Sequence, residues 1–270
     1  MDIKGRFFDM KRQARPIAVL TGYDYPTAKA EAAAGVDLIL VGDSVGTNLL
    51  GYASEQDVRL EDIAHHVRAV RRGAPNTPIL ADLPYRTYET PGMAAANARA
   101  LREAGADMVK FEGARPEIAT AIIAAGIPVC GHLGLEPQTH LDKKLRGRSA
   151  EEAAQLVQDA VALDKAGIAM LVLELIPEEV AARVTQAIAP PTIGIGAGRY
   201  TDGQVLVITD LLGLTGANYR HNRRYADLGP QIAAAMADYV RDVRIHAFPT
   251  GANAFVMPKD ALLAFEGSGE

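Results

Sequence analysis

Short apolar runs alternate with longer amphipathic stretches along most of the chain. The runs are continuously apolar rather than alternating in polarity, which is typical of strands covered on both faces in a parallel sheet. The eight runs are residues 17–20, 38–41, 79–81, 108–111, 128–130, 170–173, 192–195 and 205–208. This pattern predicts alternating β and α elements rather than separate blocks of strands and helices.

The segments between the runs carry helical signals. Val58, Ile63, Val67 and Val70 recur at the spacing of one buried helix stripe. A helix after Ser149 opens with a capping-box pattern, and segments 91–104, 116–125 and 177–188 each begin with proline. Eight strands with helices between them predict an α/β fold, a (β/α)8 TIM barrel.

The predicted barrel departs from the ideal pattern near its end. Only residues 196–204 separate the last two strands, so we expect a reduced element between strands 7 and 8. The chain divides into a single barrel domain, 1–247, and a C-terminal extension, 248–270. We expect the long helix after Arg223 to pack where a barrel helix would, and the His65–His66 pair to lie on the surface.

Composition and charge exclude several classes of protein. The 270 residues are 49% hydrophobic and 23% charged, an ordinary globular balance. A net charge of −5 argues against a nucleic-acid-binding protein and against a polybasic segment that anchors the chain to a membrane. No signal-peptide pattern opens the chain, and glycine and proline interrupt its longest uncharged stretch, 118–135. The single cysteine, Cys130, indicates a reducing compartment, and we expect the cytoplasm.

Ionisable residues follow most of the predicted strands. In a (β/α)8 barrel the carboxyl ends of the strands form the functional face. Six of the eight runs end in or beside such a residue, namely Asp43, Asp82, Glu112, His132, Glu174 and Asp210. This clustering predicts an active site at that end of the barrel.

Asp43 and Asp82 follow different strands, and no arginine lies near them in the sequence. Two converging carboxylates could bind Mg²⁺, which prefers few carboxylates and keeps waters that a substrate can displace. Each aspartate could instead cap the helix that follows it. The sequence leaves these two alternatives open.

Three further residues have both a structural and a functional interpretation. Lys110 lies inside an apolar run, and Glu112, on the same side of the strand, is its expected partner. That pair could be structural, or the ammonium could contact an anionic substrate. Glu174 leaves an apolar strand and is a candidate proton acceptor. His132 could donate a hydrogen bond to a substrate oxygen, although a satisfied barrel histidine is the commoner case.

Six segments together resemble the ketopantoate hydroxymethyltransferase family, in the same order and at similar spacing. They are TGYDYPTA (21–28), GVDLILVGDS (35–44), ADLP (81–84), VKFEG (109–113), GHLGL (131–135) and IGIGAG (193–198). The resemblance runs from about the first strand to residue 248. It implies a barrel of the phosphoenolpyruvate-binding superfamily type and a cytoplasmic homo-oligomer, commonly a decamer.

The resemblance also implies a reaction, in which a hydroxymethyl group passes from 5,10-methylenetetrahydrofolate to 3-methyl-2-oxobutanoate. The product is 2-dehydropantoate, a step of pantothenate biosynthesis, formed through a metal-stabilised enolate. The residue roles that it implies are metal ligands for Asp43 and Asp82, with Glu112 bound directly or through the outer shell, keto-acid contacts for Ser44 and Lys110, a site histidine at His132, and the general base at Glu174.

One loop departs from the family pattern and motivates an alternative. Family members usually carry Gly-Gly-Tyr between the histidine strand and the next helix, whereas residues 138–147 read QTHLDKKLRG. The alternative is a Mg²⁺-dependent aldolase or carbon–carbon lyase of the same superfamily, acting on another 2-oxo acid without folate. A degenerate barrel that serves as a binding partner is a third, non-enzymatic hypothesis.

Overall fold

The computed structural model describes residues 2–140, 142, 144–216 and 219–267. Its centre is a closed barrel of eight parallel strands, in which each strand pairs with its neighbours in the sequence and β8 pairs with β1. The strands are β1 Ile17–Thr21, β2 Leu38–Val41, β3 Ile79–Asp82, β4 Met108–Lys110, β5 Val129–Gly134, β6 Met170–Glu174, β7 Thr192–Ile195 and β8 Gly203–Leu206. The predicted (β/α)8 barrel is therefore confirmed.

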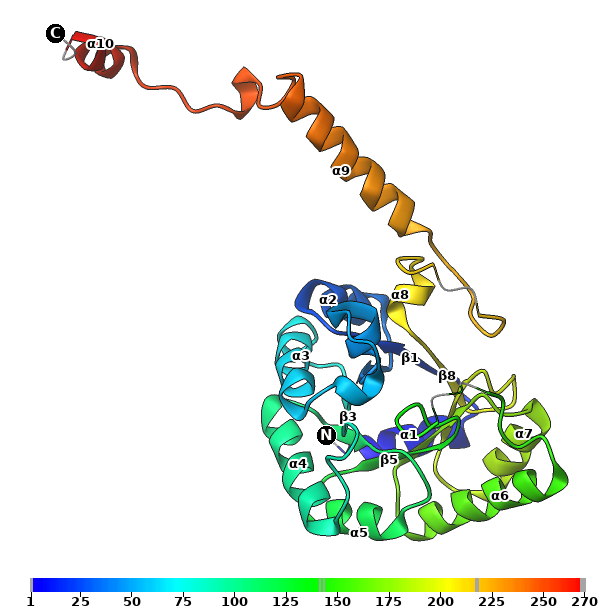
Figure 1. Cartoon of the computed structure of the whole chain (residues 1–270). Coiled ribbons are helices and arrows are strands. Elements are labelled where there is room, and N and C mark those ends of the chain that lie inside the picture. Colours follow the sequence, from blue (N-terminus) through cyan, green and yellow to red (C-terminus); the bar gives the residue numbers. More distant parts are fainter. Residues whose placement is uncertain (1, 141, 143, 217–218, 268–270) are drawn as a thin grey trace.

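Helices surround the barrel over most of its circumference (Figure 1). They are α2 Tyr25–Ala34, α3 Leu60–Gly73, α4 Pro91–Ala104, α5 Pro116–Ala124, α6 Ala150–Lys165 and α7 Glu178–Ala187, with the short helices η1 Gly46–Leu50 and η2 Glu55–Asp57 after β2. Ser149 caps α6, since its side chain accepts a hydrogen bond from the Glu152 backbone N–H. No helix separates β7 from β8, which confirms the reduced element expected there.

Two predicted strand ends differ from the structure by two residues or more. Strand β5 continues to Gly134, so that His132 lies within the strand rather than after it. The last run was expected to extend to Ile208, but β8 ends at Leu206 and Ile208 begins the short helix α8, Ile208–Leu211. The Ile208 N–H donates to the Thr21 hydroxyl at 3.0 Å. This bond turns the chain out of the sheet and towards the cavity at the carboxyl ends of the strands.

Apolar side chains fill two layers, one between the strands and the outer helices and one inside the barrel. The inner layer includes Ile3, Phe7 and Met10 of helix α1, Ile3–Arg12, which the sequence pattern did not predict. Asp2 caps this helix by accepting from the Gly5 N–H. Because α1 contributes to the interior of the barrel, the functional cavity opens at the other end.

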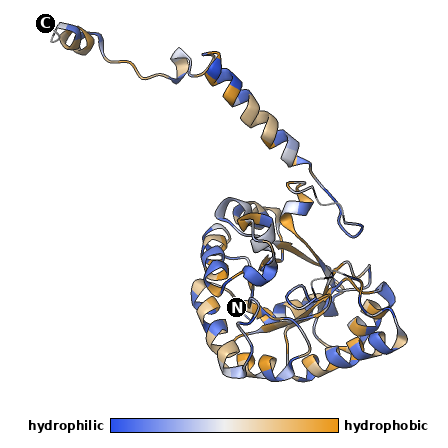
Figure 2. Ribbon diagram, viewed as in Figure 1, coloured by the Kyte–Doolittle hydropathy of each residue, from blue (hydrophilic) through white to orange (hydrophobic). Residues whose placement is uncertain are grey.

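The long helix after Arg223 does not pack on the barrel, contrary to our expectation. Helix α9, Leu228–Arg244, has no buried residue and extends away from the strands (Figure 1). Its ribbon in Figure 2 nevertheless includes hydrophobic as well as hydrophilic positions. The exposed large hydrophobic side chains of α9 are Ile232, Met236, Tyr239, Val240 and Val243. A helix whose apolar positions all face water normally finds a partner surface in the assembled protein.

The chain beyond α9 is also exposed throughout its described part. It contains η3, Gly251–Asn253, and α10, Lys259–Gly267, with Phe255 and Val256 among its most exposed apolar residues. In the described ranges, none of the helices has the length and apolar character needed to cross a bilayer.

The two adjacent histidines of α3 have different surroundings, which corrects part of the surface prediction. His65 is exposed, but His66 is buried, and its Nδ1 lies 2.6 Å from the Tyr23 carbonyl oxygen. His66 therefore links α3 to the end of β1, whereas His65 faces solvent as expected.

Glu31 of α2 is a buried carboxylate outside the cavity. It is 3% exposed, and neither of its oxygens has a hydrogen-bond partner among the described residues. A Cβ at Gly22 would lie 2.5 Å from Oε2 of Glu31, so the carboxylate fits only against glycine. Burial, with a smaller contribution from Asp24, raises the pKa of Glu31 to about 8.

This carboxylate should make stability depend on pH. Because its folded pKa is raised above the unfolded value of 4.5, its contribution is fully present below pH 4.5 and is lost as the pH rises through 8. We expect Glu31→Gln to remove this loss. The free energy of unfolding of the variant, relative to that of wild type, should therefore increase by roughly 2–4 kcal/mol between pH 4.5 and pH 9. Denaturant unfolding at both pH values measures it. The exposed Glu103→Gln is the control, and a parallel pH dependence in wild type and Glu31→Gln would contradict the prediction.

Candidate functional site

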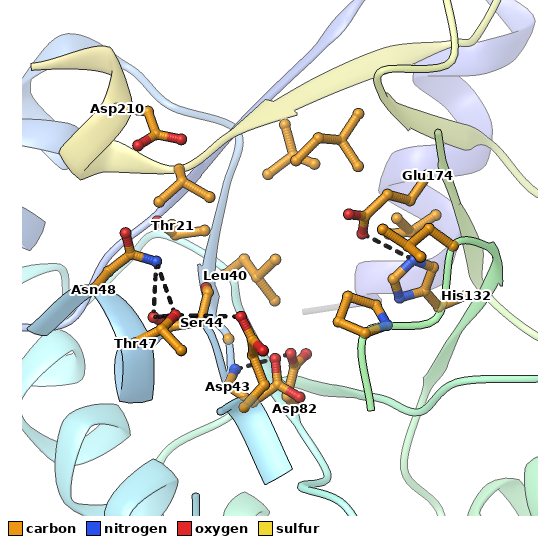
Figure 3. Close-up of a pocket in the computed structure, with 18 of the residues that line it drawn as sticks. Thr21, Leu40, Asp43, Ser44, Thr47, Asn48, Asp82, His132, Glu174 and Asp210 are labelled. Atoms are coloured by element: carbon orange, nitrogen blue, oxygen red, sulfur yellow. Dashed lines mark hydrogen bonds and ion pairs between the residues drawn. The ribbon is translucent and has the colours of Figure 1, made fainter. Parts of the chain in front are cut away.

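A cavity of about 440 Å³ lies at the carboxyl ends of the barrel strands. Figure 3 shows Asp43, Ser44 and Asp82 on one wall, facing His132 and Glu174 on another. All seven predicted site residues line it, namely Asp43, Ser44, Asp82, Lys110, Glu112, His132 and Glu174. All eight strands contribute at least one lining residue, so the barrel itself positions the site.

Asp43 and Asp82 lie next to each other in one wall of the cavity, which we call the acidic wall. The backbone N–H of Asp43 donates to Oδ2 of Asp82 at 3.1 Å, and both side chains are buried. Neither aspartate is the capping residue of a following helix. The capping alternative is therefore excluded, and the two carboxylates converge as the metal hypothesis requires.

Lys110 pairs with a different residue from the one expected. Its ammonium lies 3.3 Å from Oδ2 of Asp82, whereas Glu112 was the predicted partner. Strand β4 ends at Lys110, so Glu112 has already left the strand, and the parallel register places Lys110 opposite Asp82 on β3. The ammonium also lies 3.2 Å from Nδ1 of His132. Lys110 thus connects the acidic wall to the histidine.

The contacts of His132 determine its protonation. An ammonium can only donate, so Nδ1 accepts from Lys110 and the proton of a neutral imidazole is on Nε2. That nitrogen lies 3.2 Å from Oε2 of Glu174 but makes no aligned hydrogen bond among the described residues. The predicted base is therefore adjacent to a neutral N–H group.

Burial controls the charges in this cluster. It raises the pKa of Asp43 to about 7, assisted by Asp82, and raises the pKa of Asp82 and of Glu112, with Lys110 opposing all three shifts. Burial, and then Lys110, lowers the pKa of His132 well below its usual value. Burial alone would lower the pKa of Lys110, but Asp82, Glu112 and Asp43 raise it above its ordinary value. The cluster therefore keeps Lys110 positively charged beside carboxyl groups whose pKa values are raised by burial.

Ser44 and Glu112 occupy the edges of the same cavity. The hydroxyl of Ser44 lies 2.8 Å from the hydroxyl of Tyr23. Oε1 of Glu112 lies 3.6 Å from Nδ1 of His132, and Oε2 accepts from the backbone N–H of Gln138 at 3.0 Å. Ser44 can donate to a bound ligand, and Glu112 lies beside Lys110 and His132 rather than against the two aspartates.

The acidic wall is compatible with a magnesium ion held by few protein ligands. Within the described ranges, no three His, Cys, Asp or Glu side chains are grouped closely enough to form a complete ligand set. Oδ1 of Asp82 is nevertheless buried without a hydrogen-bond partner in the described part of the chain. Magnesium commonly uses one or two carboxylates and keeps several waters. The donor set therefore fits Mg²⁺ bound by Asp43 and Asp82.

Sequence reasoning missed the residues that the loops bring to the site. Gln138 is fully buried, and its side chain donates to Oδ2 of Asp43 at 2.7 Å. Tyr219, His221 and Asn222, from the segment between α8 and α9, line the cavity beside Asp210. These residues lie outside strands and helices, where periodicity gives no signal. For Gln138 alone the sequence held a signal, namely the unusual sequence of the 138–147 loop.

The sequence matches known proteins over nearly its full length. The family model of ketopantoate hydroxymethyltransferase matches residues 4–251. A 3-methyl-2-oxobutanoate hydroxymethyltransferase of Roseiflexus sp. is 48% identical, with 96% of each chain covered. The protein of that name from a Geobacillus sp. is 44% identical, with 99% of each chain covered.

Solved structures with a similar fold are more distant in sequence. A 2,3-dimethylmalate lyase, described as a member of the PEP mutase/isocitrate lyase superfamily, has a TM-score of 0.60 at 17% identity, with 99% of each chain covered. A phosphonopyruvate hydrolase has a TM-score of 0.62 at 12% identity, covering 99% of this chain and 96% of that one. These structures support the barrel type. On its sequence, this chain belongs to the ketopantoate hydroxymethyltransferase family.

Proposed function

We propose that this protein transfers a hydroxymethyl group from 5,10-methylenetetrahydrofolate to 3-methyl-2-oxobutanoate, yielding 2-dehydropantoate for pantothenate biosynthesis. Family membership supports the reaction. The observation that carries the chemistry is the placement of the acidic wall, Asp43 and Asp82, across one cavity from Glu174 (Figure 3). This arrangement offers an anchor for a 2-oxo acid on one side and a proton acceptor on the other.

We further propose that Asp43 and Asp82 hold Mg²⁺, with Glu112 nearby. When bound, the ion would stabilise the negative charge that develops on the keto oxygen as the C3 proton leaves. One solved structure of similar fold is a phosphonopyruvate hydrolase in complex with oxalate and Mg²⁺. Its low identity gives no ligand set for this chain, so the metal proposal rests on the buried, unpartnered oxygen of Asp82.

The side chains of this chain then have distinct tasks. Lys110 and Ser44 would bind the carboxylate and keto oxygens of the substrate, since both are donors at the cavity wall. Glu174 would accept the proton from C3, with Nε2 of the neutral His132 lying 3.2 Å from its carboxylate. The resulting carbon nucleophile would form a C–C bond to the one-carbon unit. The two C–N bonds to the folate break, water supplies the hydroxyl oxygen, and tetrahydrofolate leaves.

A product assay tests the proposed function. The purified protein, 3-methyl-2-oxobutanoate, 5,10-methylenetetrahydrofolate and Mg²⁺ should yield 2-dehydropantoate, detected by mass spectrometry, and omission of either substrate should abolish it. Exchange of the C3 proton in D₂O without any folate-dependent product would instead support the lyase alternative. Family membership favours the transferase.

We also propose a cytoplasmic homo-oligomer, of the decameric kind that the family resemblance implies, with small-molecule substrates and no nucleic acid. The exposed apolar side chains of α9 support self-association. We expect Met236→Glu with Tyr239→Glu, two exposed positions of α9, to reduce the particle mass in analytical ultracentrifugation. The exposed α4 change Glu103→Gln should not. A wild-type protein that sediments as a monomer at micromolar concentration would contradict this proposal.

A further inference from the structure

Gln138 makes several hydrogen bonds beside the acidic wall. It lies in the loop after β5 and is fully buried. Its amide nitrogen donates to Oδ2 of Asp43 at 2.7 Å and to the Leu83 carbonyl oxygen at 3.1 Å. Its backbone N–H donates to Oε2 of Glu112 at 3.0 Å. One residue therefore contacts two of the three carboxylates proposed for the metal site.

The orientation of this amide is fixed by its partners. The carboxylate of Asp43 and the carbonyl of Leu83 are acceptors, so the NH₂ group of Gln138 must face them. The hydroxyl of Tyr88 donates to Oε1 of Gln138 at 2.5 Å. Tyr88 is itself buried and packs beside Phe111. A rotated amide would turn its oxygen towards these two acceptors, and the hydrogen bond from Tyr88 adds to the orientation that they impose.

The loop that carries Gln138 is anchored independently of its side chain. Gln56 of η2 donates from its amide nitrogen to the backbone carbonyl oxygen of Gln138 at 2.7 Å. This bond holds the loop but does not touch the carboxylates. The position of the loop and the position of the acidic groups therefore depend on different side chains, Gln56 and Gln138, and can be tested with separate variants.

We propose that Gln138 is a positioning residue, which holds Asp43 and Glu112 in the geometry that receives the divalent ion and is itself held by Tyr88. The inference rests on the proposed function, because it takes the acidic wall as the metal site. Groups that bond to metal-ligating carboxylates typically contribute about 10–100-fold to metal affinity. Gln138 bonds two such groups while using both hydrogens of its amide.

The test is a set of single variants measured by calorimetric titration with Mg²⁺, alongside the melting temperature of the metal-free protein. Gln138→Met keeps the length of the side chain but removes its amide, and we expect the Kd for Mg²⁺ to rise about 10–100-fold. Tyr88→Phe leaves Oε1 of Gln138 without its donor, so the amide is held less firmly, and we expect a rise of at least about threefold. Gln56→Met removes only the loop anchor. We expect the Kd of this variant for Mg²⁺ to stay within about twofold of the wild-type value.

The double variant supplies a readout that a merely structural role would not produce. Because Tyr88 acts through Gln138, adding Tyr88→Phe to Gln138→Met should raise the Kd no further than Gln138→Met alone. If the two effects multiplied, or if Gln56→Met matched Gln138→Met, the residue would serve only the loop and the inference would be wrong. If Gln138→Met does not fold, Tyr88→Phe decides, and an unchanged Kd overturns the inference.

The outcome is distinguishable from a failure of the proposed function. Wild-type protein that binds Mg²⁺ and makes product, with an unchanged Kd in Gln138→Met, overturns the positioning role alone. Wild-type protein that binds no Mg²⁺ overturns the metal site and the positioning role together.

Discussion

Replacing Glu174 with glutamine should abolish proton abstraction and leave binding largely intact. The amide keeps the shape of the side chain but cannot take up the C3 proton of the keto acid. We expect exchange of that proton in D₂O, followed by proton NMR with Mg²⁺ present, to fall by about 10²–10⁴-fold. The Kd for 3-methyl-2-oxobutanoate should change by no more than about threefold. The base interacts with the proton that leaves in the transition state and is not needed to bind the substrate.

A neighbouring exposed residue provides the matched control. Glu179 lies five positions further along the chain in α7 and is exposed, so Glu179→Gln should exchange at the wild-type rate. If Glu174→Gln exchanged as fast as wild type while still binding the keto acid, the proton would have another acceptor.

Replacing Asp82 with asparagine should remove the response of the protein to Mg²⁺. Asp82 supplies the buried carboxylate oxygen that has no hydrogen-bond partner among the described residues, and an amide is a far poorer magnesium ligand. In wild type, Mg²⁺ at 100 times its Kd should stabilise the fold by about 2.7 kcal/mol. We expect no rise in melting temperature with Mg²⁺ in Asp82→Asn, and no proton exchange.

A graded comparison separates this role from a general charge effect. Glu112 lies beside His132 rather than against the aspartates, so Glu112→Gln should weaken Mg²⁺ binding by about 10–100-fold without abolishing it. The melting temperature of each metal-free variant serves as the control for folding. A normal Mg²⁺ response in Asp82→Asn would show that the ion binds elsewhere.

The fold followed from the sequence because each βα unit carries its own local signals. Continuous apolar runs, a buried helix stripe and proline at helix starts all agreed with the same architecture. The site residues could be predicted for a related reason. A barrel brings the carboxyl ends of all its strands together. Asp43, Asp82, His132 and Glu174 each lie near the carboxyl end of a strand, and that position was enough to predict that they share one site.

The partner of Lys110 could not be found in this way. Its pairing with Asp82 depends on the register between β3 and β4, and a single strand gives no information about that register. Gln138 was missed because a loop residue has no periodic environment, and its importance comes from contacts 26 to 95 positions away. Helix α9 was misplaced because its apolar stripe predicts a buried face without identifying the surface that buries it.

The dependence of C3 proton exchange on a divalent ion tests the central claim most directly. Protein treated with a chelator and transferred to D₂O with 3-methyl-2-oxobutanoate should exchange at least about 100-fold more slowly than the same protein with Mg²⁺, because the charge on the keto oxygen would lack its counter-ion. Adding Mg²⁺ back should restore the rate. Equal rates with and without the ion would contradict an acidic wall that works by binding a metal.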